Sequence, residues 1–383
     1  MRPLDGARVH IVGVVLTGLA ATAAIGGVHP PVQVALSASA LLWFAILVWR
    51  RGARGLRVLP FVAPAALALG FTLVQLVPLP RALVGLISPA ALELREGALG
   101  HAPAWLPLTV DVPATLLELV KGFACLGLLI TTAHLCRRRS NARVVLWPLA
   151  FLGVALGALV MAQRLTGAST ILGYHVRATL GVGFFGTLVC GNHAASIFAL
   201  SALCAVGLAV EKEGAARFVL AWAAASSAAG LFYTTSRGGA CGFAIGGALL
   251  VAIVVGRRVG RLQGVLAAAI LLMVATGGAL WLADGLRSRL VPSSTHEIWS
   301  NPKTRGMRDG LVLARHFPWT GVGRGAFEAP VAAYRAVEDG VRLVYPENLP
   351  VELAAEYGLP IAAALLVLAV MSARRVRQRL SKL

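Results

Sequence analysis

Charged residues are scarce in this sequence, and acidic ones are the scarcest. Only 13% of the 383 residues are charged, with 16 Asp and Glu against 35 Lys and Arg. A soluble chain of this length carries roughly a quarter charged residues. The mean hydropathy is +0.78, and apolar runs of about 20 residues, the length that crosses a bilayer, recur from end to end. The scarcity of charge therefore excludes a water-soluble protein and predicts an all-α, polytopic transmembrane helical bundle.

Cysteine motifs and nucleotide-binding loops are also missing. The five cysteines form no CxxC pair and no metal-ligand spacing. Most lie in or beside apolar runs, where Cys packs as a small apolar residue. No Walker loop, no HExxH segment and no soluble basic domain with interleaved aromatics occurs. We therefore expect no disulfide framework, no metal, no cofactor and no nucleic-acid partner.

Long apolar runs are what the sequence has in abundance, and they predict about ten spans. The first run follows MRPLDGAR and also fits a secretory signal with a small-residue cleavage site. We favour an uncleaved first span, because it makes the number of spans even. The expected spans are 9–28, 32–49, 58–79, 114–134, 144–163, 193–210, 218–235, 239–256, 264–283 and 349–371.

Basic residues gather in alternate connections between these spans. Because short basic loops stay in the cytoplasm, the pattern predicts that both termini are cytoplasmic. The residues on that side are Arg50, Arg51, Arg54, Arg57, Arg137, Arg138, Arg139, Arg143, Lys212, Arg217, Arg257, Arg258 and Arg261, followed by those of the C-terminal tail.

The same topology divides the chain into three regions. Residues 1–283 form the transmembrane bundle with spans one to nine, and residues 349–383 form the last span and a basic cytoplasmic tail. Residues 284–348 form a large outer loop, which is too long to be a mere connector. Its stretch TRGMRDGLVLARHF (304–317) has the pattern of an amphipathic helix on the membrane surface. Two further outer loops are expected at 80–113 and 164–192.

Arginines on the outer side are the informative minority of the positive charge. Arg237 stands in YTTSRGG, a turn between two apolar runs, and a guanidinium near hydrocarbon costs roughly 2.5–3.5 kcal/mol. Arg164 and Arg177 lie in a loop without acidic residues. One interpretation is solvated loop charge or contact with lipid headgroups. The other is a site for an anionic ligand at the membrane boundary.

Several motifs in order give the chain a family resemblance. They are PLPRALVGLISPAALEL with WLPLTVDVPATLLELV (105–120), then FFGTLVCGNHAASIFAL (184–200), TTSRGG (234–239), RDGLVLARHFPWTGVGRGAF (308–327) and PENLPVELAAEYGLP (346–360). Together they resemble the O-antigen ligase and polymerase superfamily of bacterial glycan transferases, from about residue 60 to 365.

This resemblance implies a glycosyltransferase in the bacterial inner membrane, with a partly helical periplasmic loop. The family takes a glycan from an undecaprenyl-pyrophosphate carrier and moves it to an acceptor hydroxyl, with inversion and without metal or nucleotide. The acceptor is the lipid A–core for ligases and another glycan for polymerases. The implied partners are therefore the lipid-linked donor, one of these acceptors and membrane lipid.

Arginines carry the donor side of the implied chemistry. In the family the Arg of the SRGG turn contacts the pyrophosphate, and we transfer that role to Arg237. Its planar fork suits two phosphate oxygens better than a Lys does. The family also has an Arg just before or within the surface helix, which Lys303, Arg305 or Arg308 could match.

The acceptor side departs from the family pattern. Where the family places His before Asn, this sequence has Glu347 and Asn348. A carboxylate can act as the base if its surroundings tune its pKa, so we expect Glu347 to replace the His or to shape the site. The family also has a Glu at the position of Glu356, which could orient an arginine, and His193 belongs to the GNHAA stretch.

Two other functions fit parts of the pattern. A secondary transporter of an anionic solute would also have many spans, although such transporters show paired broken helices in two halves. No convincing internal repeat is found. An inactive relative that binds the carrier lipid would explain the exchange of His for Glu347.

Overall fold

The structure is a computed structural model, and it describes residues 6–52, 59–168, 170–173, 185–260, 302–335 and 343–380, with Leu56 and Gln263 as isolated positions. Helices dominate these residues, which makes the chain an all-α protein. The chain separates into two compact units. Unit 1 is Met1–Ser39 with Thr132–Pro292, and unit 2 is Ala40–Thr131 with Ser293–Leu383.

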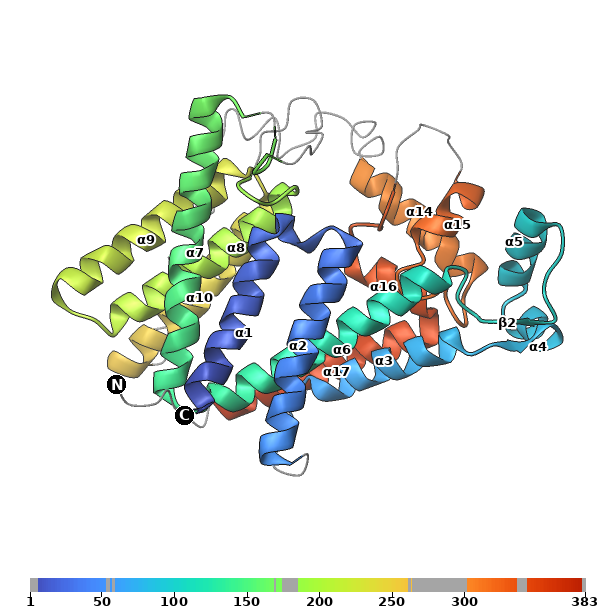
Figure 1. Ribbon diagram of the computed structural model, residues 1–383, viewed down its shortest axis with the longest axis horizontal. Coiled ribbons are helices and arrows are strands. Elements are labelled where there is room, and N and C mark those ends of the chain that lie inside the picture. Colours follow the sequence, from blue (N-terminus) through green and yellow to red (C-terminus); the bar gives the residue numbers. More distant parts are fainter. Residues whose placement is uncertain are drawn as a thin grey trace. The chain divides into compact units, whose positions relative to one another are not determined.

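Unit 1 is a group of long apolar helices. In it α8 packs against α7, α9 and α10, while α1 packs against α7 (Figure 1). The elements of unit 1 are α1 (Gly6–Ala23), η1 (Ile25–Gly27), α7 (Arg139–Thr166), α8 (Gly191–Val210), α9 (Gly214–Tyr233) and α10 (Arg237–Arg258).

Small residues let the helices of unit 1 approach closely, as is common between helices in membranes. A Cβ at Gly153 of α7 would stand 2.8 Å from the Cβ of Ser201 on α8. Its backbone N–H donates to the Ser201 hydroxyl at 3.0 Å. Phe198 is fully buried, and a Cβ at Gly230 would collide with its ring. Any larger side chain at Gly153 or Gly230 therefore pushes α8 away.

Unit 2 combines apolar helices with shorter elements. Here α3 packs against α17, and α14 packs against α15 and α16 (Figure 1). The elements that lie wholly in unit 2 are α3 (Val62–Leu76), β1 (Leu79–Pro80), α4 (Arg81–Ile87), α5 (Pro89–Leu99), β2 (Trp105–Leu106), α14 (Pro302–His316), α15 (Glu328–Tyr334), α16 (Leu349–Tyr357) and α17 (Leu359–Leu380). Two helices cross the unit boundaries, namely α2 (Pro30–Arg51) and α6 (Val112–Leu135).

The helix predicted at 304–317 is present as α14, and its place at the membrane surface stays a prediction. Leu313 of α14 and Phe317, directly after its last residue, enter a core with Phe327 and Ala355, while Arg308 and Arg315 of α14 are exposed. This alternation is what an amphipathic helix requires.

Seven of the described helices are long and apolar enough to cross a membrane, which makes the chain a multi-pass membrane protein. These seven are α2, α6, α7, α8, α9, α10 and α17, and the apolar stretches of α1 and α3 are shorter. All of them overlap spans expected from the sequence, and α17 is the one that is displaced, since it runs over Leu359–Leu380 where 349–371 was expected. The expected span at 264–283 lies outside the described residues.

Two expected regions differ from the structure. The loop 80–113 contains helices α4 and α5, and β1 pairs with β2 in an antiparallel ladder that joins Leu79 to Leu106. The span expected at 349–371 is two helices, because Gly358 interrupts it with φ 77° and ψ 162°. Only α17 has the length of a span, and the segment before Gly358 is the separate short helix α16, which packs against both α14 and α17.

Candidate functional site

The turn that carries Arg237 lies between α9 and α10. Thr235 adopts a positive φ of 53°, which turns the chain sharply. Ser236 then caps α10 by accepting a hydrogen bond from the N–H of Gly239 at 3.2 Å. Arg237 is the first residue of α10; it is exposed, and the first turn of that helix contains no acidic residue. The sequence therefore places an accessible guanidinium at the positive end of a long helix.

Arg164 lies at the same end of unit 1, in the last turn of α7. Its Nε donates to the Tyr233 hydroxyl at 2.5 Å, and its guanidinium carbon is 4.8 Å from the centre of that ring. Tyr233 is the last residue of α9, directly before the turn with Arg237. The structure therefore brings together the end of α7 and the Arg237 turn, which are about 70 residues apart in the sequence.

The start of α8 completes this end of unit 1. Asn192 accepts a hydrogen bond from the Ser236 hydroxyl at 2.8 Å, and the next residue, His193, is exposed. A Cβ at Gly239 would collide with Ala195 on α8, whereas a Cβ at Gly238 would meet nothing within 4 Å. The two glycines thus differ, since Gly239 serves helix packing and Gly238 leaves open space beside Arg237. We call Arg164, His193 and Arg237 the arginine end of unit 1; Arg177 lies outside the described residues.

The predicted residues of unit 2 gather where α14 meets the start of α16. Gly306 of α14 faces Pro346, since a Cβ there would be 3.4 Å from the Pro346 Cα. Arg305 and Arg308 flank this contact; Arg305 is half-buried and Arg308 is exposed. On the buried side of α14, Asp309 pairs with Arg335 at 3.2 Å and is 5% exposed.

Glu347 and Asn348 have different local roles. The Asn348 side chain caps α16 by accepting from the N–H of Val351 at 3.2 Å, and its amide is 3.6 Å from the sulfur of Met307. Glu347 is exposed and has a positive φ of 52°. Such a conformation is strained for a residue with a Cβ, so the chain holds this carboxylate at the surface beside α14.

Glu356 faces an arginine rather than open space. Its carboxylate is 2.5 Å from Nη1 of Arg324, and the same nitrogen is 2.8 Å from Glu352. Glu118 on α6 is 3.4 Å from the other terminal nitrogen of Arg324, and it also pairs with Lys121. We call Glu118, Arg324, Glu352 and Glu356 the carboxylate cluster. Three carboxylates already surround this guanidinium, so it is not available to clamp a phosphate.

Backbone contacts fix the loop that carries Arg324. The buried amide of Gln75 on α3 donates to the carbonyl oxygens of Thr320 and Glu356, at 2.8 and 2.7 Å. Its oxygen accepts from the N–H of Arg324 at 3.1 Å. The N–H of Val322 donates to the Ala355 carbonyl at 2.9 Å. One side chain thus joins α3, the loop and α16.

Glycines make this close approach possible, which explains the TGVGRG motif. Gly321, Gly323 and Gly325 have φ values of 65°, 108° and 76°, which suit glycine. A Cβ at Gly325 would stand 2.5 Å from Glu118, and one at Gly358 would stand 2.6 Å from the Trp319 backbone. The glycines of this loop after α14 therefore serve packing around the carboxylate cluster.

Burial and neighbouring charges shift the pKa values of two members of the carboxylate cluster, Glu356 and Arg324. Burial raises the pKa of Glu356 from its ordinary 4.5 to about 7, even though the Arg324 guanidinium opposes this shift. Burial alone would lower the pKa of Arg324, but the carboxylates of Glu356 and Glu118 raise it well above the ordinary value. Arg324 therefore stays charged, while Glu356 can change its charge near neutral pH.

Sequence reasoning missed Arg324, Glu352 and Gln75 as members of a site. Two signals were present: Glu352 and Glu356 are four residues apart and share a helix face, and Gln75 is an amide inside an apolar run. Among the described residues, no group of three His, Cys, Asp or Glu side chains could hold a metal ion.

The helices of the described residues define a multi-pass membrane protein, and each of its two units carries exposed arginine side chains among the predicted site residues, Arg237 in unit 1 and Arg308 in unit 2. A comparison with known families matches residues 222–371 to the family described as O-antigen ligase. Over these residues, which are less than half of the chain, the match confirms the resemblance to the superfamily of ligase- and polymerase-like glycosyltransferases. No curated protein and no solved structure gives a significant match.

Proposed function

We propose that the chain is a glycosyltransferase at the periplasmic face of a bacterial inner membrane. It moves a glycan from an undecaprenyl-pyrophosphate carrier to an acceptor hydroxyl of a lipid A–core or of another glycan. The observation that supports this most strongly is the family match over residues 222–371. That range includes the Arg237 turn, the surface helix α14 and the Glu347–Asn348 pair.

On the donor side, Arg237 stabilises the departing pyrophosphate. Negative charge grows on the bridging oxygen as the sugar–oxygen bond breaks, and a fixed cation there lowers the barrier. The exposed position of Arg237 at the start of α10 supports this role, since the backbone N–H groups of a helix N-terminus also favour phosphate. Arg164, held by Tyr233, adds positive charge at the same end of unit 1.

On the acceptor side, Glu347 is the base. The acceptor oxygen attacks the anomeric carbon, the bond to the pyrophosphate oxygen breaks, and the hydroxyl proton passes to the Glu347 carboxylate. No metal takes part. Asn348 holds the position of Glu347 by capping α16, and Arg305 and Arg308 on the neighbouring α14 bind anionic groups of the substrates. Glu356 acts indirectly, because its contact with Arg324 holds α16 against the loop.

The substitution Arg237→Ala tests the proposal. The purified chain is supplied with an undecaprenyl-pyrophosphate-linked glycan and an acceptor, and product is measured with and without the substitution. Losing one such cation typically costs about 10²–10³ in rate, so we expect a loss of this size with an unchanged melting temperature. Arg138→Ala is the matched control, since Arg138 is also exposed at a helix start in unit 1. Equal transfer by both variants would contradict the proposed role.

The exchange of His for Glu at position 347 supports one other candidate, an inactive relative that only binds the carrier lipid. Glu347→Gln and Glu347→His separate the two. The transferase proposal expects transfer by the wild type, with Glu347→Gln at least a hundredfold slower, since a positioned base contributes about 10²–10⁴. If only Glu347→His is active, the chain is an inactive relative.

A further inference from the structure

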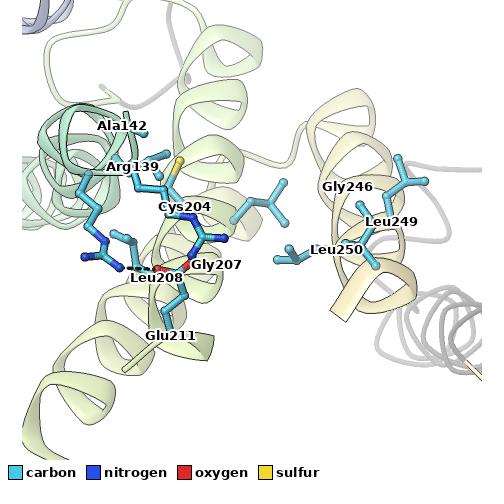
Figure 2. Close-up of a pocket in the computed structure, with 13 residues that line it drawn as sticks. Arg139, Ala142, Cys204, Gly207, Leu208, Glu211, Gly246, Leu249 and Leu250 are labelled. Carbon is cyan, nitrogen blue, oxygen red and sulfur yellow. Dashed lines mark hydrogen bonds and ion pairs between the residues drawn. The ribbon is translucent and has the colours of Figure 1, made fainter. Parts of the chain in front are cut away.

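A groove opens in unit 1 at the end away from Arg237. Its volume is about 480 Å³, and it is lined by residues of α7, α8 and α10. Figure 2 shows Arg139 and Ala142 of α7 with Cys204, Gly207 and Glu211 of α8 on one side, and Gly246, Leu249 and Leu250 of α10 on the other. Between His193 and Gly207 α8 advances about 20 Å, at 1.5 Å per residue, so the groove is separate from the arginine end.

Most of the groove wall is apolar. Leu203, Cys204 and Leu208 form its α8 side, and Leu249 and Ile253 stand on α10 with exposed fractions of 60% and 45%. A Cβ at Gly207 would meet nothing within 4 Å, so this glycine leaves the floor open. A wall of this kind suits a hydrocarbon chain better than a polar solute.

Positive charge stands at one rim of the groove. Arg143 pairs with Glu211 at 3.1 Å, which occupies its charge in part. Arg139 is exposed in the first turn of α7, and no carboxylate in the described part of the chain pairs with it. Among the described residues of the lining, Glu211 is the single acidic one, against the two arginines Arg139 and Arg143. The rim therefore has net positive charge next to an apolar trough.

We propose that this groove binds an anionic glycerophospholipid, with one acyl chain between α8 and α10 and the headgroup phosphate at Arg139. Charge complementarity identifies the occupant, because an apolar trough that ends at an arginine matches an acyl chain that ends at a phosphate. The rim also lies where two expected spans end, at headgroup depth, and basic residues there attract anionic lipid. This site is independent of the proposed glycan transfer.

Native mass spectrometry of the full chain in non-ionic detergent tests the site. Phosphatidylglycerol is titrated against the wild type and two variants. Arg139→Gln removes the charge at the rim, and Gly207→Leu places a side chain in the apolar trough. We expect the fraction of protein that keeps its tightest-bound lipid to be about five to ten times lower for each variant than for the wild type. One arginine near a membrane surface strengthens the binding of an anionic lipid about fivefold.

Matched controls make the result decisive. Arg138→Gln removes a neighbouring charge outside the groove, and Gly242→Leu adds a side chain on α10 where a Cβ meets nothing; both should retain lipid like the wild type. Equal retention by all five proteins would overturn the proposal. So would a lower melting temperature of Gly207→Leu with unchanged lipid retention, since another segment of the chain would then fill the groove. Undecaprenyl phosphate that competes as well as phosphatidylglycerol would overturn the assignment of the ligand.

Discussion

Arg324 and Arg237 both precede a glycine, yet the two arginines have opposite surroundings. Arg324 lies in a glycine-rich loop of unit 2 that Gln75 holds, and three carboxylates surround it. Arg237 begins a long helix of unit 1, is exposed, and has no acidic residue in its helical turn. The comparison shows that an Arg-Gly pair does not define a role. The carboxylates around Arg324 give its guanidinium a structural role, whereas the role of Arg237 at a helix N-terminus as an anion contact is the proposal made above.

The largest effect on stability is expected from Arg324→Met. The substitution leaves the Glu356 carboxylate buried without its cation, and breaking a buried ion pair typically costs about 3–5 kcal/mol. Thermal unfolding in detergent at pH 8 should show this loss. Arg315→Met is the control, because Arg315 is exposed on α14. If both variants unfold at the same temperature, the carboxylate cluster does not stabilise unit 2.

The next largest effect is a pH dependence of the free energy of unfolding, which the substitution Glu356→Gln should remove. The pKa of Glu356 is raised from 4.5 to about 7 in the folded chain, so the folded state holds a proton that the unfolded state releases. Stability is then full below pH 4.5 and falls as the pH rises through 7, by about 3 kcal/mol. Melting temperatures from pH 5 to 9 should decline less for Glu356→Gln than for the wild type. Parallel curves would show that Glu356 does not titrate in this range.

The smallest effects separate two glycines. Gly323 has a φ of 108°, and its Cβ would collide with Thr109, so Gly323→Ala should cost about 1–3 kcal/mol. Gly238 has helical geometry and open space, so Gly238→Ala should leave stability unchanged or raise it by up to about 1 kcal/mol. Melting temperatures measured side by side check both. If the two substitutions change the melting temperature by the same amount in the same direction, Gly323 in the loop and Gly238 beside Arg237 do not differ as proposed.

The sequence predicted most of the membrane-crossing helices, because runs of about 20 apolar residues have few other structures available in a bilayer. It predicted a loop between spans at 80–113 but not the helices α4 and α5 within it, which are too short to give a periodic signal. It also joined α16 to α17, because the residues on both sides of Gly358 are apolar and only the backbone angle of that glycine separates them.

The candidate site was predictable only in part. Motif order identified Arg237, Glu347 and Glu356, and the structure adds the contacts that hold Arg164 near the Arg237 turn. The carboxylate cluster was not predicted, because Glu118 and Arg324 are about 200 residues apart and their contact depends on tertiary packing. Which residues act in catalysis stays a prediction.

The central claim is that Arg237 contacts the carrier pyrophosphate, which is expected only at the outer face of the membrane. The most direct test is therefore to find on which side of the membrane the Arg237 turn lies. Gly238→Cys is made in a variant without the five native cysteines, and a membrane-impermeant thiol reagent is applied to intact spheroplasts. Position 238 is suitable because a Cβ there meets open space. Arg138→Cys, expected in the cytoplasm, is the control. We predict labelling at 238 and none at 138 until the membrane is opened. Labelling at 138 with 238 protected would contradict the account.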